Sequence, residues 1–284
     1  MAMAPALAER AGAVHEVPPG RVDEIAGALL DEVDPGQLVV ALGGGRVVDT
    51  AKALAAAHAP GERPLVAAVP TTLSAAEMTA VHRRAAGADT SLPGVRPARV
   101  VNDPALSASQ PDAELAASAA NALAHAVEGP ATVRASPVPS LAGREAARLI
   151  GTAYASGGEP DRDTLALAAL LSGYTIDSAG YGLHHVLSQT LARFAGVGHG
   201  QSNAVMLPHT LGALERRGAP GAGALVALAA DLARRAQAIS LRELGVDEAA
   251  LNSYADAAAE RAELDAIPPR PDRDELRALY AAAF

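Results

Sequence analysis

The sequence predicts an α/β domain with a short parallel sheet, followed by an all-α helical domain. Two patterns carry this prediction. Up to about residue 110, apolar runs that end in Gly or Pro alternate with segments of helical spacing, which is typical of a parallel sheet flanked by helices. Beyond that point long Ala- and Leu-rich segments dominate and strand patterns nearly vanish. We therefore expect two domains, 1–110 and 111–284.

In the first domain, the strongest strand patterns are continuous apolar runs. Strands of a parallel sheet are buried on both faces, so they contain few polar residues. Turn residues such as three consecutive glycines mark where these runs stop. The predicted strands are Ala13–Val17, Gln37–Leu42, Pro64–Val69 and Arg99–Val101, and the predicted helices cover residues 22–33 and 47–58.

In the second domain, every segment places apolar residues at helical spacing and is bounded by Gly or Pro. Aromatic residues make up only 2% of the chain, so Ala, Leu and Val must build the core. Small side chains of this kind predict closely packed helices. The predicted helices cover residues 112–128, 138–154, 161–193, 202–217, 221–238, 247–263 and 272–283.

Composition excludes several classes of function. A net charge of −9 argues against a nucleic-acid partner, which needs a basic surface. Without cysteine the chain has no disulfide, thiolate nucleophile or Cys-bound metal. No apolar run approaches the roughly 20 residues that span a bilayer, so no membrane partner is expected. The first residues also lack the basic segment of a signal peptide, and we expect a cytoplasmic protein.

A glycine-rich turn follows the strand predicted at 37–42. Gly43, Gly44 and Gly45 separate this strand from a helix that carries Asp49. Glycines at such a junction let backbone N–H groups approach a phosphate, and the helix N-terminus adds a favourable dipole. The alternative is a tight turn that simply requires glycine. Three consecutive glycines favour phosphate binding.

Hydroxyl groups follow the next predicted strand, 64–69. Thr71 and Thr72 come directly after it, and Ser74 and Glu77 lie a few residues further on. Hydroxyls at the carboxyl edge of a parallel sheet are placed to contact a ligand. However, Ser74 and Glu77 also have the spacing of a helix-capping box. From these residues alone, helix capping is the stronger interpretation.

A candidate centre in the helical domain contains Asn121 and three histidines. Asn121 and His125 share one helix face, and His185 and His199 follow 14 residues apart. Four positions of this kind predict a metal site, because catalytic metals have three or four protein ligands. A neutral amide stands where a carboxylate is usual. His184 is a further catalytic candidate, although adjacent helical residues point about 100° apart and only one should face the site.

The ordered motifs resemble those of the iron-containing (group III) alcohol dehydrogenases. They are G-G-G-x-x-x-D-x-x-K, P-T-T-x-x-x-x-E, N-A-L-x-H-A-x-E, and G-L-x-H with a second His 14 residues on and L-P-H closing. The branch most similar to this chain is that of the maleylacetate reductases, which often carry Asn at the first metal position. The resemblance covers the chain from about residue 35.

This resemblance implies a dehydroquinate synthase-like fold and an NAD(P)-dependent oxidoreductase. Hydride would pass between the nicotinamide and a small carbonyl, enone or alcohol substrate. The pyrophosphate of NAD or NADP would bind at Gly43–Gly45. Asp49, Thr71 and Thr72 would surround the nicotinamide half, and Ser74 completes the set of cofactor-binding candidates.

The resemblance also implies Fe²⁺ or Zn²⁺ bound by Asn121, His125, His185 and His199. The metal, or the histidine cluster in its absence, would polarise the substrate oxygen. Asn121 removes a negative charge from the ligand set and should weaken cation binding, so the presence of a metal stays open. By analogy with the family, we expect a homodimer.

Other departures from the family pattern keep alternatives open. Gln189 replaces a histidine thought to relay a proton, and glutamine cannot titrate. Arg46 and Ala75 stand where Ser and Gly are usual, and the chain is shorter at its N-terminus than members of the family. A second hypothesis is therefore a lyase, isomerase or hydrolase that kept the histidines but lost nicotinamide use. A non-catalytic binding protein is disfavoured, because nothing structural requires three such histidines.

Overall fold

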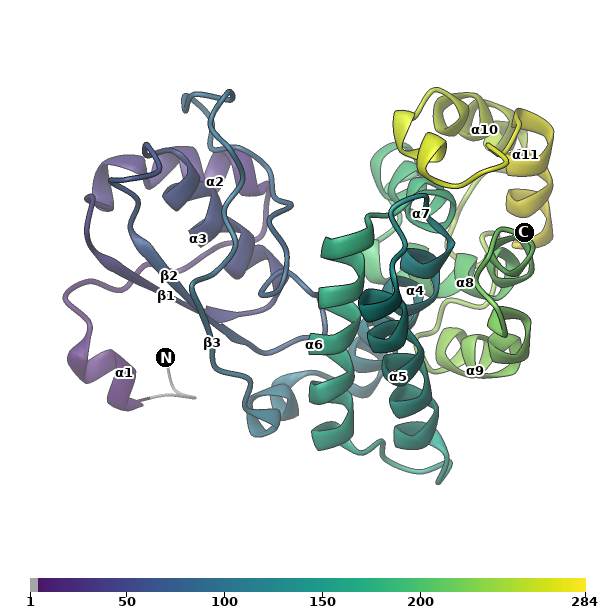
Figure 1. Ribbon diagram of the computed structural model, residues 1–284, viewed down its shortest axis with the longest axis horizontal. Helices are drawn as coiled ribbons and strands as arrows, with labels where there is room; N and C mark the ends of the chain where they lie inside the picture. The colour runs from purple at the N-terminus through teal and green to yellow at the C-terminus, as the bar shows by residue number, and fades with distance from the viewer. Residues whose placement is uncertain (1–4) are drawn as a thin grey trace. The chain divides into compact units, whose positions relative to one another are not determined.

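The computed structural model describes residues 5–284, which divide into two compact units (Figure 1). Unit 1 contains the chain up to Thr71 together with Ala76–Ser109. Unit 2 contains Thr72–Ala75 together with Gln110–Phe284. Unit 1 holds a parallel sheet with helices and unit 2 is helical, so the predicted fold class is confirmed. The grouping of residues 72–75 with the helical unit was not expected from the sequence.

The sheet of unit 1 has three parallel strands in the order β1-β2-β3. Leu38 pairs with Leu65 at one end of the register, and Gly43 pairs with Pro70 at the other. The elements of unit 1 are α1 (Pro5–Arg10), α2 (Val22–Ala28), β1 (Leu38–Gly43), α3 (Gly45–Ala56), β2 (Leu65–Pro70) and β3 (Arg99–Val100).

The two faces of this sheet differ in burial. Ala41, Val66 and Ala68 lie on one face, where they are buried and pack with side chains of α3. On the opposite face, Leu38 is 63% exposed and its partner Leu65 is 60% exposed. Parallel sheets are usually covered on both faces. Within residues 5–284, this sheet is well covered on one face only.

The strand predicted at Ala13–Val17 is wrong. These residues form no regular secondary structure, and most of their side chains are exposed. An apolar alternation predicts a strand only if another strand lies beside it to complete the hydrogen bonds. The described sheet has no strand next to β1 on its free side, so this segment stays irregular.

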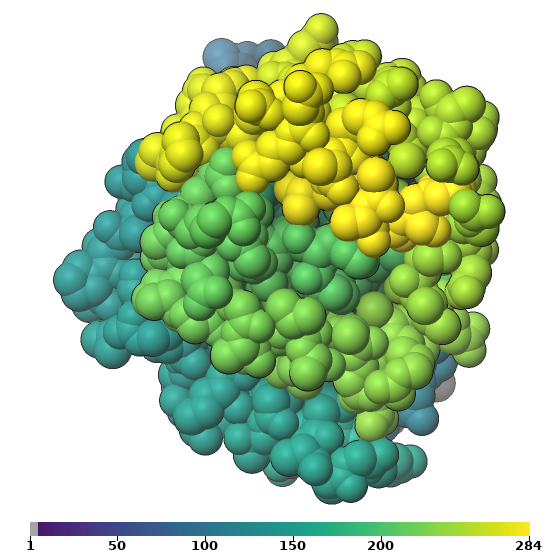
Figure 2. Space-filling model, turned by 90° about the vertical axis from the view of Figure 1, so that its right-hand side faces the viewer, coloured from purple at the N-terminus to yellow at the C-terminus, as the bar shows by residue number. Residues whose placement is uncertain are grey.

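Unit 2 is built around α4, which packs against α5, α6, α8 and α9. Figure 2 shows the outer side of this unit, where the C-terminal segment lies beside residues of α7 and α8. The helices are α4 (Asp112–Glu128), α5 (Pro137–Tyr154), α6 (Arg162–Ala179), α7 (Leu183–Phe194), α8 (His199–Glu215), α9 (Val226–Arg235), α10 (Leu251–Ala259) and α11 (Arg273–Ala282).

The single helix predicted over 161–193 is wrong, because the chain breaks between α6 and α7. Gly180 has φ +76°, a conformation that favours glycine. A Cβ on Gly182 would lie only 2.2 Å from Cγ1 of Ile267. The break places His184 and His185 in the first turn of a new helix.

Small residues bring the helices of unit 2 close together, as the composition predicts. A Cβ on Gly143 of α5 would lie 2.4 Å from the carbonyl oxygen of Ala126 on α4. Only glycine allows this approach of the two backbones. Within residues 5–284, no helix has both the length and the apolar character needed to cross a membrane.

Candidate functional site

The glycine turn of unit 1 connects β1 to α3. Gly43 has φ +155°, and a Cβ there would lie 2.6 Å from Cγ2 of Val47. Gly44 is the N-cap residue of α3, and no side chain caps this helix end. The first backbone N–H groups of a helix need partners, and an anion is favoured at this position. The glycine turn therefore leaves the first N–H groups of α3 without a side-chain cap.

Asp49 lies one turn into α3, where the buried Lys52 holds it. The Nζ of Lys52 lies 2.8 Å from Oδ1 of Asp49, and the Asp49 side chain is 30% exposed. Lys52 also donates to the carbonyl oxygens of Ala76 and Val81, each at 2.9 Å. It thereby fastens the loop after β2 to the helix that follows the glycine turn.

The hydroxyl residues after β2 fall on both sides of the division between the units. Thr71 belongs to unit 1, and its N–H donates to the carbonyl oxygen of Gly43 at 3.0 Å. In unit 2, the N–H of Leu73 donates to Oγ of Ser118 on α4 at 2.9 Å. The Oγ1 of Thr72 is buried without a hydrogen-bond partner, so it is available to a ligand.

The capping box predicted for Ser74 and Glu77 is wrong, because residues 74–80 contain no helix. Glu77 is instead buried in unit 1, and its Oε2 has no hydrogen-bond partner. Burial raises the pKa of Glu77 to about 7, although the nearby Lys52 opposes this rise. The carboxyl group of Glu77 thus lies buried in the loop after β2, which Lys52 holds against α3.

Asn121, His125 and His185 lie together in the interior of unit 2. They come from α4 and α7 and are 6%, 7% and 4% exposed. The rings of His125 and His185 are stacked, with centroids 4.7 Å apart and planes inclined by 10°. Oδ1 of Asn121, Nδ1 of His125 and Nε2 of His185 are buried without hydrogen-bond partners. Such atoms are costly unless a ligand or water pairs with them.

Burial keeps these rings neutral. It lowers the pKa of His185 to about 3, and the neighbouring His199 adds to this effect. Burial also places the pKa of His125 well below its usual value, with smaller contributions from His185, His199 and His184. The cluster is therefore uncharged near neutral pH. It can exchange hydrogen bonds with a polar group without being a fixed cation.

His184 turns away from this cluster. Its ring lies edge-on to that of His185, with centroids 5.1 Å apart. Its Nδ1 lies 2.9 Å from Oγ1 of Thr210, and its Nε2 lies 3.1 Å from Oδ1 of Asn203. Both nitrogens are occupied and the side chain is fully buried, so His184 supports the cluster without a free atom for substrate.

Sequence reasoning missed Glu128, the last residue of α4. Its Oε2 lies 2.5 Å from Nδ1 of His185, and its Oε1 accepts the backbone N–H of His184 at 2.6 Å. Burial raises the pKa of Glu128 to about 7. The signal was present, since Glu128 stands three residues after His125 and seven after Asn121, near the same helix face.

Gln189 contacts a polar group beside the cluster. Its Oε1 accepts from Nη2 of Arg261 at 2.9 Å, and Arg261 is also paired with Glu263 at 2.6 Å. The hydroxyl of Tyr181 lies 3.4 Å from Oε1 of Glu263, and its ring lies 5.6 Å from that of His185. The side chain at the position expected to carry a relay histidine is therefore hydrogen-bonded to Arg261.

The four side chains predicted as metal ligands do not fit a divalent cation as they stand. A ring nitrogen coordinates through the lone pair in its ring plane, so the stacked rings of His125 and His185 cannot both point at one ion. His199 is exposed, and its Nε2 lies 3.3 Å from Nδ2 of Asn203. Within residues 5–284, no group of three His, Cys, Asp or Glu side chains is arranged to hold a metal.

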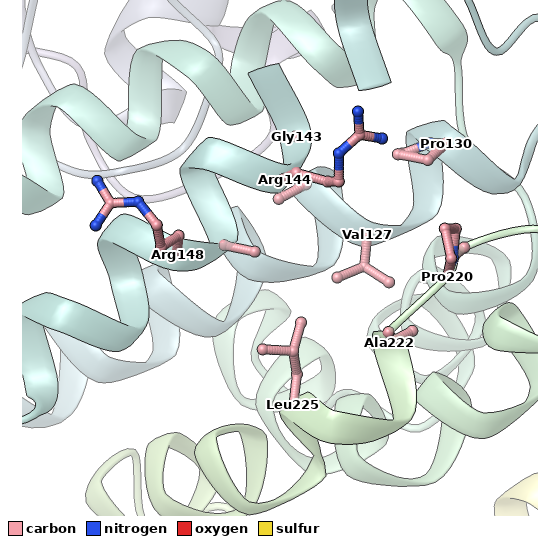
Figure 3. Close-up of a pocket in the computed structure, with 12 residues that line it drawn as sticks. Val127, Pro130, Gly143, Arg144, Arg148, Pro220, Ala222 and Leu225 are labelled. Carbon is pink, nitrogen blue, oxygen red and sulfur yellow. The ribbon is translucent and has the colours of Figure 1, made fainter. Parts of the chain in front are cut away.

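A separate hollow of about 290 Å³ lies between α4, α5 and the turn at 219–225 (Figure 3). Val127 and Leu225 contribute apolar side chains to it, while the guanidinium groups of Arg144 and Arg148 point away from them. None of the residues predicted from the sequence lines this hollow. The candidate site is therefore the cluster of Asn121 and the histidines.

Comparisons with known proteins show which family this chain resembles. A model of the Fe-containing alcohol dehydrogenase family, C-terminal part, matches residues 115–222, which include Asn121 and the three histidines. Maleylacetate reductase 2 of Cupriavidus pinatubonensis is 36% identical over 209 residues, covering 70% of this chain and 56% of the relative. Maleylacetate reductase of Pseudomonas aeruginosa is 32% identical over 270 residues, covering 87% of this chain and 73% of the relative.

Solved structures show the same likeness. The crystal structure of maleylacetate reductase from Agrobacterium tumefaciens matches with a TM-score of 0.83 and 28% identity, covering 100% of this chain and 86% of that one. The chain belongs to the iron-containing alcohol dehydrogenase family. Within that family, the relatives it resembles include maleylacetate reductases, as the motifs predict, and also a 1,3-propanediol dehydrogenase.

Proposed function

We propose that this chain is an NAD(P)-dependent reductase that transfers a hydride to a small carbonyl or enone substrate. Maleylacetate is the first candidate substrate, because the relatives just described are maleylacetate reductases. One observation carries the proposal. Three buried polar atoms without partners, on Asn121, His125 and His185, lie in the part of the chain that the family model matches. No observation favours the lyase, isomerase or hydrolase alternative.

The nicotinamide cofactor would supply the hydride when bound. Gly43–Gly45 and the uncapped N-terminus of α3 would hold its pyrophosphate. Asp49, Thr71, Thr72 and Ser74 are the other residues proposed to hold it. The partnerless hydroxyl of Thr72 supports its place in this set.

The neutral cluster would bind and orient the substrate oxygen. The free Nδ1 of His125 can donate a hydrogen bond to that oxygen, and the free Nε2 of His185 can accept one from a hydroxyl of the substrate. Oδ1 of Asn121 can accept from a hydroxyl of the substrate. Since all three side chains are buried, the site excludes bulk water from the reacting groups. These roles do not require a metal ion.

Titration calorimetry with NADH and NADPH tests the cofactor half of this proposal. We expect one of them to bind, and Gly44→Asp to weaken binding about tenfold, or roughly 1.4 kcal/mol. A carboxylate at the N-cap would compete with the pyrophosphate for the N–H groups of α3. Asp is also a favoured N-cap residue, so the helix itself should stay folded.

Gly61→Asp is the matched control, since Gly61 lies on an exposed turn with nothing within 4 Å of an added Cβ. It adds the same charge to unit 1 away from the glycine turn. Absence of binding of both nucleotides to the unaltered protein would contradict the proposed function. The sequence does not decide between NAD and NADP. The cytoplasmic location, expected from composition, and the homodimer, expected from the family resemblance, stay predictions.

A further inference from the structure

Glu128 bridges the end of α4 and the start of α7. The N-cap residue of α7, Gly182, has no side chain to cap the helix. Oε1 of Glu128 takes that role by accepting the N–H of His184 at 2.6 Å, and the N–H groups of Gly182 and His185 also form hydrogen bonds with this carboxyl. A helix N-terminus favours a negative group. The surroundings of Glu128 therefore contain donors and require an acceptor.

These donors decide which nitrogen of His185 carries the proton. In its carboxylate form Glu128 can only accept, so its Oε2 then receives Nδ1–H from His185 across 2.5 Å. In a neutral imidazole the other nitrogen then has no hydrogen. That atom, Nε2 of His185, is the one that is buried without a partner.

The neighbouring His184 is held in the opposite tautomer. Nδ2 of Asn203 donates to the carbonyl oxygen of His199 at 2.8 Å, and this fixes Oδ1 of Asn203 toward His184. Nε2 of His184 therefore carries the proton and donates to this oxygen, while its Nδ1 lies 2.9 Å from Oγ1 of Thr210, a hydroxyl that also lies 3.1 Å from the carbonyl oxygen of Leu207. Two adjacent histidines thus differ in tautomer because side chains from two different helices hold them.

We propose that Glu128 is a positioning residue that holds Nδ1–H of His185 and leaves Nε2 as a hydrogen-bond acceptor for a hydroxyl of the substrate. The part played by the substrate rests on the proposed function. The tautomer does not, because it is a property of the folded chain. Glu128 itself touches no substrate and acts through His185.

Glu128→Gln is the sharpest test, because glutamine has the shape of glutamate but only one acceptor oxygen. The backbone N–H of His184 cannot accept, so the amide oxygen of Gln must stay on it. The amide NH₂ then faces Nδ1 of His185 and forces that nitrogen to accept. The variant should therefore move the proton of His185 from Nδ1 to Nε2.

The measurement is long-range proton–nitrogen NMR of the full chain labelled with nitrogen-15 histidine, at pH 8. The signal of His185 is identified by its loss in His185→Ala. We expect an Nδ1–H tautomer for His185 in the unaltered protein and an Nε2–H tautomer in Glu128→Gln, with His184 unchanged as Nε2–H in both. Turnover with NADH should fall about tenfold or more in kcat, while KM for NADH stays within about twofold.

Glu145→Gln, on the exposed side of α5, is the control and should leave both histidine signals and turnover unchanged. An Nε2–H tautomer for His185 in the unaltered protein overturns the proposal, and so does an unchanged tautomer in a folded Glu128→Gln. If that variant does not fold, the spectrum of the unaltered protein tests the proposal by itself. It should show an Nδ1–H tautomer for His185, with the Nδ1 proton shifted downfield by a short hydrogen bond. Failure of both NADH and NADPH to bind would instead reject the reductase proposal.

Discussion

The two units of this protein use buried polar groups in different ways. In the α/β unit, Lys52 satisfies the carbonyl oxygens of Ala76 and Val81 and so fastens a loop. In the helical unit, Asn121, His125 and His185 keep buried atoms without partners. Buried polar groups are normally paired, so an unpaired cluster marks a place where a ligand completes the bonds. Oε2 of Glu77 in the α/β unit is also buried without a partner, so the helical unit is distinguished by three such atoms on side chains that lie together.

The units also differ in how their apolar residues pack. The sheet of the α/β unit leaves Leu38 and Leu65 largely exposed on one face. The helical unit instead buries a continuous core of Ala, Leu and Val around α4, with Gly143 against the backbone of Ala126. We expect the helical unit to be sensitive to added volume and the α/β unit to be sensitive to charge.

The largest expected effect is on turnover, from His185→Ala in the helical unit. Loss of a side chain that orients the substrate should lower kcat by about 100-fold. Calorimetric binding of NADH should stay within about twofold, because the cofactor candidates lie elsewhere. If the folded variant keeps its turnover, the unpartnered polar atoms of the helical unit do not mark the groups that act on the substrate.

Gly143→Ala tests the sensitivity of the helical unit to volume. The added Cβ would lie 2.4 Å from a backbone oxygen of α4, which side-chain rotation cannot relieve. We expect a loss of about 2 to 3 kcal/mol in the free energy of unfolding, measured in urea. Gly151→Ala in the same helix is the control, since its Cβ would lie 3.7 Å from a flexible Leu228 side chain. Equal losses in the two variants would contradict the close backbone contact.

Glu77→Gln tests the sensitivity of the α/β unit to charge. The pKa of Glu77 is raised to about 7 in the folded chain, from an ordinary value of 4.5, mainly by burial. The folded state therefore binds the proton more tightly, which stabilises it fully below about pH 4.5. This stabilisation is lost as the pH rises through about 7.

Glutamine stays neutral, so the variant should be more stable than the unaltered protein at pH 8 by an amount on the order of 2 kcal/mol. At pH 4.5 the difference should be much smaller. Calorimetric unfolding of both proteins at the two pH values gives the comparison, and Glu128, which titrates in the same direction, is present in both. A difference that does not depend on pH would show that burial of the charge is not the cause.

The smallest expected effect comes from Ala75→Gly, in the segment 72–75 that joins the helical unit. Ala75 has φ +65°, a conformation in which its Cβ is strained. Glycine relieves this strain but loses more entropy on folding, so we expect a net gain of up to about 1 kcal/mol. Thermal unfolding measures it, and Ala86→Gly in unit 1 is a control with an expected loss. A loss in Ala75→Gly would show that this turn relaxes without glycine.

Short sequence patterns predicted many of the strands, turns and helices of this protein. The apolar runs around β1 and β2, the glycine turn before α3, and the i,i+4 placement of Asn121 and His125 were all predicted from sequence. The reason is that backbone geometry repeats every two residues in a strand and every 3.6 in a helix. The ordered motifs also indicated the family that the comparisons confirm.

Only the tertiary structure decided how the site is arranged. Glu128 and His185 are 57 residues apart in the chain, and their contact depends on how α4 packs beside α7. The same packing stacks His125 on His185 and turns His184 toward α8. The break at Gly180–Gly182 that starts α7 arises from close contact with Ile267. Sequence spacing fixes which residues share a helix face, but hydrogen bonds between helices are set by packing over the whole unit.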